Sequence, residues 1–191
     1  MSAEDRRQAI VEAVIPLLFR QGAAVTTRQM AEAAGVAEGT IFKVFADKHA
    51  LIHEAVKVVS DPAPVQKELA AIDLDAPFET QLRTAAAILL RRLEQVVALM
   101  SVLRTMPVGS PQNAGLPPFL AEANAAIVSS LTRIFETHRQ ILRLPPRRAA
   151  VMFRGLLFAA GHLAATVGET LTVDDIVSVL LSGIVVPEAD R

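Results

Sequence analysis

The helical spacing of apolar residues is the feature that most constrains what this chain can fold into. From residue 4 to about residue 186, apolar side chains recur at intervals of three and four positions, as Ile10, Val14 and Leu17 do in the first segment. Prolines and glycines separate these segments, and no alternating strand pattern, repeat or low-complexity tract interrupts them. The sequence therefore predicts an all-α protein.

Start and stop signals divide the chain into helices. Thr26 and Gln29 form a capping-box pattern, Asp47 stands at another N-cap position, and Thr172 precedes acidic residues that favour a helix start. Gly22 and Gly35 are stop signals. We predict helices over 4–21, 26–34, 38–45, 48–60, 65–72, 77–105, 119–140, 146–167 and 173–186, with an irregular proline-rich loop over 106–118.

A proline-rich break marks a domain boundary. Two prolines fall within the four residues Asp61-Pro62-Ala63-Pro64, where a helix cannot easily continue. We therefore predict one domain over residues 1–60 and a second, larger helical domain over residues 61–191.

Composition excludes several classes of protein. The 191 residues include no cysteine, which rules out disulfide scaffolds and thiolate metal sites. Hydrophobic residues make up 52% of the chain, yet the best apolar stretch, Gly155 to Gly168, is shorter than a membrane span and carries His162. The N-terminus has no signal-peptide pattern. We expect a soluble cytoplasmic protein without membrane association, cofactor or bound metal.

The predicted helices 26–34 and 38–45, with Gly35 between them, have the spacing of a helix-turn-helix. Ala31 is small where the two helices would cross, and Gly35 permits the turn. Val36, Ile41 and Val44 are expected to face the core. The residues then left to point outward, towards a DNA groove, are Glu38, Gly39, Thr40, Phe42 and Lys43. An ordinary helical hairpin is the alternative on this spacing alone.

The longer sequence carries a more specific pattern. The run TTRQMAEAAGVAEGTIFKVFADKHAL, residues 26–51, resembles the signature of the TetR/AcrR family of transcriptional regulators. The resemblance extends over residues 6–59 and in the rest of the chain is one of length and helical layout. It implies an N-terminal three-helix helix-turn-helix DNA-binding domain and a C-terminal helical domain for ligand binding and dimerisation.

The resemblance also implies roles for single residues. Thr26 and Thr27 would hold backbone phosphates, and Arg28 would reach a phosphate or a base edge. Lys48 lies at a helix N-terminus, which favours a phosphate. In the recognition helix, Gly39 would allow close approach to DNA, and the contacts would come from Glu38, Thr40, Phe42 and Lys43.

Three positions depart from the family pattern. Phe42 replaces the usual Tyr and loses a phosphate hydrogen bond of about 0.5–1.5 kcal/mol. Ala37 replaces a common capping Ser, which weakens the helix start by roughly 0.5–2 kcal/mol. His49 follows Lys48 in place of an acid. Residues 1–59 also hold seven basic and seven acidic residues, so any basic face must be local.

The larger domain has candidates for an effector pocket. Arg154 and His162 interrupt a nearly continuous apolar helix, as the few polar groups that orient a largely apolar ligand would. A buried structural role is the alternative for both. Near the proline-rich loop, the further candidates for the pocket, or equally for plain core, are Met100, Arg104, Met106 and Phe119.

Two C-terminal helices carry stripes of small and aliphatic residues. The resemblance implies that these helices pair with their copies in a homodimer as a four-helix bundle, while intramolecular core is expected to account for part of each stripe. The stripe residues are Leu157, Gly161, Ala164, Ala165 and Gly168 on the first helix, and Ile176, Val179, Leu180, Gly183 and Ile184 on the second.

No pattern in the sequence favours catalysis. His49 and His53 have the spacing of helical zinc ligands, but Ala50 replaces the glutamate of the metalloprotease motif, so a solvated surface pair is favoured. Asp174 and Asp175 fit a helix cap.

The expected function is therefore a ligand-responsive transcriptional repressor, a homodimer that binds a palindromic DNA operator and is released by a small, largely apolar effector. The alternatives are a helical ligand-binding protein or enzyme with a structural helix-turn-helix, an activator, and a nucleoid-type binder.

Overall fold

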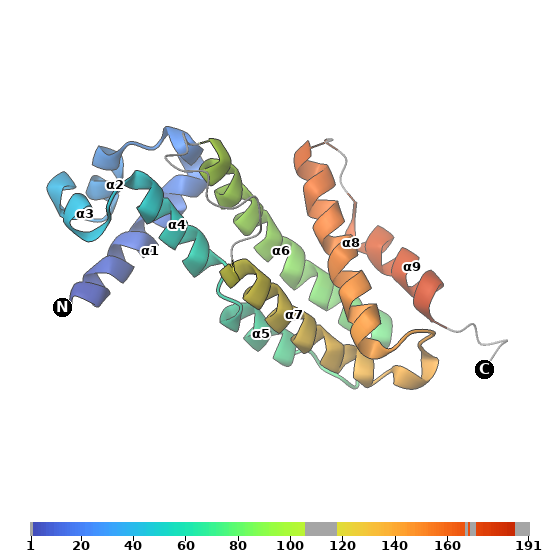
Figure 1. The fold of residues 1–191 in the computed structure, drawn as a ribbon. Coiled ribbons are helices and arrows are strands. Elements are labelled where there is room, and N and C mark those ends of the chain that lie inside the picture. Colours follow the sequence, from blue (N-terminus) through green and yellow to red (C-terminus); the bar gives the residue numbers. More distant parts are fainter. Residues whose placement is uncertain (1, 106–117, 167, 169–170, 186–191) are drawn as a thin grey trace. The chain divides into compact units, whose positions relative to one another are not determined.

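The computed structural model describes residues 2–105, 118–166, 168 and 171–185, and within these residues every regular element is a helix (Figure 1). An isolated antiparallel bridge joins Leu142 to Val185. The α-helices are α1 (Ala3–Gln21), α2 (Thr27–Ala33), α3 (Glu38–Val44), α4 (Lys48–Val59), α5 (Ala63–Ala70), α6 (Phe78–Thr105), α7 (Pro118–Glu136), α8 (Pro146–Thr166) and α9 (Val173–Ile184), with short 3₁₀ turns at Gly22–Ala24 and Arg139–Ile141. The predicted all-α class is confirmed.

Helix starts follow the capping residues. The predicted capping box of Thr26 with Gln29 is present, and Asp47 accepts a hydrogen bond from the Ala50 amide at 2.7 Å. Helix α1 begins one residue earlier than predicted because Ser2 and Asp5 form a capping box of their own.

Several predicted helix bounds differ from the structure by one to four residues. Helix α7 ends at Glu136 rather than near residue 140, because the Thr137 hydroxyl donates to the Ile134 carbonyl and the His138 amide bonds to Phe135, three residues back. Helix α9 ends at Ile184, whose carbonyl accepts from the Arg143 amide at 2.7 Å. Helix α5 begins at Ala63 because Pro64 is tolerated in a first turn. The region 106–117 of the predicted loop lies outside the described residues.

The chain divides into two compact units. The first unit comprises Met1–Asp61 and Gln95–Leu120, and the second comprises Pro62–Glu94 and Ala121–Arg191. The first division falls one residue after the predicted boundary, but the last turns of α6 are grouped with the first unit. Leu99 explains this grouping, because its fully buried side chain belongs to the core of α1–α4.

Each unit has its own apolar core. The core of the first unit is built from aliphatic side chains of α1, α2, α3 and α4, with Phe45 as its buried aromatic ring. In the second unit, helices α5 to α9 enclose Phe78, Phe135 and Phe153. The Phe135 ring packs edge-on against both the Phe78 ring and the Phe153 ring. Burial of these faces supplies most of the stability of such short helices. None of the helices in the described part of the chain is long and apolar enough to cross a membrane.

Candidate nucleic-acid interface

The turn between α2 and α3 depends on Gly35. Gly35 has φ of +64°, a left-handed conformation that glycine adopts without the strain of a side chain. Its amide bonds to the Glu32 carbonyl at 3.1 Å, and the Val36 amide bonds to the Ala31 carbonyl at 3.0 Å. These two bonds form a Schellman motif, which satisfies the last carbonyls of α2 and redirects the chain into α3.

Helix α3 is anchored by its inner face. Ile41 is fully buried and Phe45 nearly so, while Val36 and Val44 are half-buried against the same core. The predicted inward positions are therefore confirmed. On the outer face, Gly39, Phe42 and Lys43 are exposed, and the Phe42 ring is 50% accessible. An accessible helix face of this kind, on a helix that follows a tight turn, has the geometry of a recognition helix.

The first turns of α2 and α3 are linked through side chains. The Thr27 hydroxyl donates a short hydrogen bond to the Glu38 carboxylate. The neighbouring Thr26 hydroxyl accepts from the Gln29 amide at 3.2 Å, and Gln29 accepts from the Thr26 amide at 2.9 Å. The amides of Thr27 and Arg28 have no acceptor within the helix, because the first amides of a helix never do. These two amides are the backbone donors that we predict to face a DNA phosphate.

The charges around this face are partly paired. Arg28 contacts Glu32 at 3.0 Å, with both side chains well exposed. Glu38 engages Thr27, and Lys43 is exposed on α3. Exposed ion pairs such as Arg28–Glu32 contribute little to stability and exchange partners easily, so Arg28 is available to a phosphate at small cost.

The recognition helix begins without a side-chain cap. Ala37 occupies the N-cap position and makes no side-chain hydrogen bond, as its replacement of a capping serine predicts. Helix α4 is capped by Asp47, which places the half-buried Lys48 at the positive end of the helix dipole.

Arg7 is a structural residue that the sequence did not reveal. Its Nη1 donates to the Val44 carbonyl at 3.1 Å, its guanidinium lies 4.5 Å from the centre of the Phe45 ring, and Nη2 is 3.5 Å from the Glu54 carboxylate. Arg7, on α1, therefore contacts both α4 and the C-terminal end of α3. Only the fold brings these residues together, so no local pattern could have predicted the contact.

All nine predicted DNA contacts lie in the first unit. Six are exposed, namely Thr26, Arg28, Glu38, Gly39, Phe42 and Lys43, and three are half-buried, namely Thr27, Thr40 and Lys48. They occupy the starts of α2 and α4 and the outer face of α3, as a groove-reading motif requires. Their contacts with DNA stay predictions.

Comparison with known proteins agrees with this geometry. Residues 10–55 match the family described as bacterial regulatory proteins, tetR family. By this match, the protein carries a TetR-family DNA-binding domain at its N-terminus. It is a non-enzymatic, DNA-binding transcriptional regulator.

Solved structures of TetR-family regulators share the fold over nearly the whole chain. A putative TetR-family regulator from Mesorhizobium loti is 20% identical with a TM-score of 0.68, covering 97% of this chain and 100% of that one. NalD, the secondary repressor of the MexAB-OprM multidrug efflux pump in Pseudomonas aeruginosa, is 18% identical with a TM-score of 0.56, covering 95% and 98%. The SmeT–triclosan complex is 18% identical with a TM-score of 0.59, covering 96% and 93%.

The described residues include no cluster of three or more potential metal ligands. His49 is exposed on α4, while His53 is half-buried and packs edge-on against the Phe119 ring at 5.5 Å between centres. His53 is thus packed against an aromatic ring, so only His49 of the predicted solvated pair is exposed.

The two predicted effector residues whose side chains are described belong to different units. Phe119 belongs to the first unit and packs against its core, whereas Arg154 lies on α8 in the second unit. Met100 and Arg104 fall in α6 and His162 in α8, but their side chains lie outside the described part, as does the whole of Met106. Arg154 is therefore the predicted pocket residue whose surroundings are defined.

The Arg154 guanidinium is buried without a counter-ion among the described residues. Its Nη2 donates to the Asn124 side-chain oxygen on α7 at 3.0 Å, while Nε and Nη1 are buried with no hydrogen-bond partner. Burial lowers the pKa of this arginine from its usual value.

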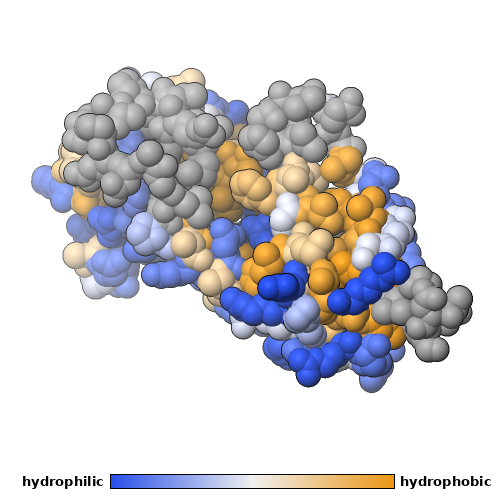
Figure 2. Space-filling view, turned by 45° about the vertical axis from the view of Figure 1, so that its right-hand side comes forward, coloured by the Kyte–Doolittle hydropathy of each residue, from blue (hydrophilic) through white to orange (hydrophobic). Residues whose placement is uncertain are grey.

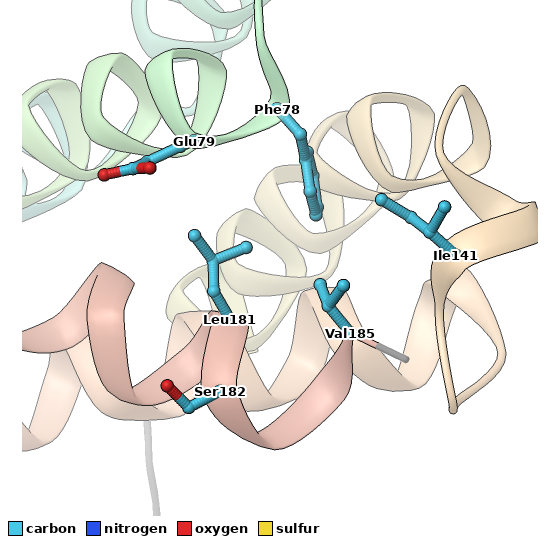
Figure 3. A pocket seen from close by; sticks show the side chains of 6 residues that line it. All are labelled: Phe78, Glu79, Ile141, Leu181, Ser182 and Val185. Atoms are coloured by element: carbon cyan, nitrogen blue, oxygen red, sulfur yellow. The ribbon is translucent and has the colours of Figure 1, made fainter. Parts of the chain in front are cut away.

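A shallow apolar groove lies elsewhere in the second unit. It encloses about 460 Å³ and is lined by Phe78, Glu79, Ile141, Leu181, Ser182 and Val185 (Figure 3). Figure 3 shows the Phe78 ring and the aliphatic side chains facing one another across it. The Glu79 carboxylate already holds Arg83 at 2.7 Å. None of the predicted effector residues lines this groove.

The predicted dimer stripe divides into buried and accessible members. Leu157, Ile176, Leu180 and Ile184 are almost completely buried in the core of their own unit, which is the intramolecular alternative. At Gly161 a Cβ atom would lie 2.7 Å from Leu93 Cδ2, so this glycine permits close packing of α8 on α6. Val179, Gly183 and Gly168 are exposed, whereas the side chains of Ala164 and Ala165 are outside the described part.

Proposed function

We propose that this TetR-family protein is a cytoplasmic homodimeric repressor that binds a palindromic DNA operator and leaves it when a small, largely apolar effector binds the larger domain. We assign DNA binding to residues 1–60 and effector binding and dimerisation to residues 61–191. The observation that carries the proposal is the exposed outer face of α3, held by the Gly35 turn and presenting Gly39, Phe42 and Lys43.

The repressor assignment is supported by one structural relative. NalD is described as a repressor of an efflux pump, and the SmeT structure holds triclosan, a small ligand. Two copies of α3 related by a two-fold axis would enter successive major grooves about 34 Å apart. An effector releases the operator only if it binds the DNA-free arrangement more tightly than the DNA-bound one.

The lysines of the first unit provide the test of DNA binding. Lys43→Ala combined with Lys48→Ala removes two phosphate-binding charges per protomer. We expect the dissociation constant for a fragment of the protein's own promoter region to rise at least tenfold, and the slope of log K against log salt to fall by about 1 for each lost phosphate contact.

The matched control is Lys57→Ala with Lys67→Ala. Both lysines are exposed, and the pair makes the same change in net charge away from the predicted contacts. Fluorescence anisotropy from 50 to 200 mM salt measures both variants, and circular dichroism verifies their folds. Equal effects in the two double variants, or no binding of promoter DNA by the wild type, would overturn the proposal.

Dimerisation is assigned to the accessible apolar side chains of α8 and α9. Val151, Met152, Phe158 and Val179 are each about half accessible or more. Figure 2 shows hydrophobic side chains gathered on a face of the second unit. Large apolar patches on a small protein are costly to leave in water and mark interaction surfaces.

Phe158→Asp with Val179→Asp tests this surface. Two buried carboxylates per protomer would oppose association, so we expect a monomer by analytical ultracentrifugation and a loss of operator affinity of at least tenfold. Leu74→Asp, at an exposed leucine of the second unit outside α8 and α9, should remain dimeric. A double variant that stays dimeric would show that the copies pair through another face.

A further inference from the structure

Arg154 differs in its partner from the arginines of this chain that form ion pairs. Arg7, Arg28, Arg83, Arg91 and Arg139 each contact a carboxylate, although all five are at least partly exposed. Among the residues that the structure describes, no carboxylate pairs with Arg154, whose Nε and Nη1 are buried. The most deeply desolvated guanidinium of this group is thus the one that lacks an anion.

The unsatisfied hydrogen-bonding capacity of Arg154 is large. A guanidinium carries five N–H groups, and those on Nε and Nη1 account for three of them. The Asn124 oxygen, at 3.0 Å from Nη2, is a neutral acceptor that does not compensate the charge. Buried polar groups in folded proteins are normally paired, and an unpaired one calls for a missing ligand, ion or water.

The neighbourhood favours an anion attached to an apolar body. Along α8, the residues one turn away from Arg154 are all apolar, namely Ala150, Val151, Leu157 and Phe158. On α7, Ala123 precedes Asn124, and Ile127 follows it by three positions; both are mostly buried. A carboxylate accepts two parallel N–H bonds, which a single guanidinium can donate. A phosphate dianion has more oxygen atoms to satisfy, so the donors of Arg154 and Asn124 suit a carboxylate better.

We propose that Arg154, with Asn124 beside it, binds the carboxylate of an amphipathic effector, and that the effector class of this protein is therefore a monocarboxylic acid with a hydrocarbon body. This inference rests on the proposed effector-controlled function and names the chemistry of its ligand. Asn124 fixes the orientation of the guanidinium, which receives the ligand charge through its remaining N–H groups. The ligand carboxylate would thereby act as the counter-ion of Arg154.

The test is a binding measurement without DNA, so that it is independent of operator binding. Isothermal titration and thermal shift compare octanoate, octanamide, octylamine and octyl phosphate on the full-length protein. We expect octanoate to bind at least tenfold more tightly than octanamide, and octylamine not to bind. Equal affinity for octanoate and octanamide would overturn the proposal, and stronger binding of octyl phosphate would replace the carboxylate with a phosphate.

Two variants locate the site. Arg154→Met should lose the preference for octanoate over octanamide, while Arg148→Met, an exposed arginine on the same helix, should keep it. Asn124→Asp retains Arg154 and places a carboxylate beside it, so we expect a higher melting temperature and at least a tenfold loss of octanoate affinity. If Arg154→Met does not fold, Asn124→Asp alone tests whether octanoate binds at Arg154. Octanoate binding unchanged in Asn124→Asp would exclude Arg154 as the site.

Operator binding in the presence of octanoate tests the regulatory step. Octanoate should weaken operator binding by the wild type and not by Asn124→Asp. If octanoate binds at Arg154 but leaves operator binding unchanged, the ligand site stands and the effector-release step of the proposed function fails.

Discussion

The hydroxyl of Thr27 donates a hydrogen bond to the carboxylate of Glu38, joining the first turn of α2 to the first turn of α3. The contact fixes the mutual orientation of the two helices of the helix-turn-helix. The bond occupies the Thr27 hydroxyl proton and places the Glu38 carboxylate beside the residues predicted to contact DNA. We therefore expect Glu38 to stabilise the motif and to oppose its binding to phosphate.

Replacing Glu38 with Gln separates these two effects. The amide oxygen still accepts from Thr27, but the charge is gone, so we expect DNA affinity at 50 mM salt to rise about three- to tenfold with little change in stability. The gain should shrink at 200 mM salt because of screening. Fluorescence anisotropy measures it, with Glu122→Gln on α7 as the charge-matched control. A loss of affinity confined to the operator would instead assign Glu38 to base recognition.

Substitution with alanine should change the free energy of unfolding in opposite directions at Gly35 and Gly39. Gly35→Ala forces a side chain into a left-handed conformation at φ of +64° and should lower the free energy of unfolding by about 1–2 kcal/mol. Gly39→Ala has open space around its Cβ in a helix, so it should raise that free energy by up to about 1 kcal/mol.

DNA binding gives the second readout for the glycine pair. If Gly39 permits close approach to the groove, Gly39→Ala should weaken DNA binding although it stabilises the fold. Urea denaturation and anisotropy on the same preparations measure both quantities. Unchanged DNA affinity in Gly39→Ala would remove the close-approach role.

Arg7→Ala should destabilise the first unit. The substitution removes the bond to the Val44 carbonyl and the contact over the Phe45 ring, and we expect a loss of about 1–3 kcal/mol by urea denaturation. Arg7→Lys should not restore it, because an ammonium lacks the planar fork that makes these contacts together. The exposed neighbour Arg6 provides the control, and an equal loss in Arg6→Ala would contradict the assigned role.

His138 should make stability depend on pH. Burial lowers its pKa below the ordinary value of 6.5, and its Nε2 lies 3.3 Å from the Gln81 oxygen, with the Phe78 ring close by. Gln81 Nε2 donates to the Leu74 and Ala76 carbonyls, so its oxygen is the acceptor and His138 Nε2 carries the proton.

The direction of this dependence follows from the lowered pKa. As pH falls through 6.5 the unfolded chain takes up a proton before the folded protein does, so the free energy of unfolding is highest above that pH and falls below it. Denaturation between pH 8 and 5 should show a smaller decrease for His138→Gln than for the wild type.

The sequence determined the features that act within one or two helical turns. Apolar spacing and capping residues such as Thr26, Asp47 and Thr172 predicted the helices to within a few residues of their ends. Gly35 predicted the turn, and the spacing of Ile41 placed the inner face of α3 correctly. These signals are readable because backbone hydrogen bonds in a helix connect residues only four positions apart.

The tertiary structure decided which long-range partners each side chain meets. Arg7 reaches the carbonyl of Val44, 37 residues along the chain, and Arg154 meets Asn124 at a separation of 30 without finding a carboxylate. On α9, Leu180 is buried and Val179 is exposed, although the two are neighbouring aliphatic residues of the same predicted stripe. The sequence could not distinguish them, because packing of one helix against another depends on geometry that no single helix contains.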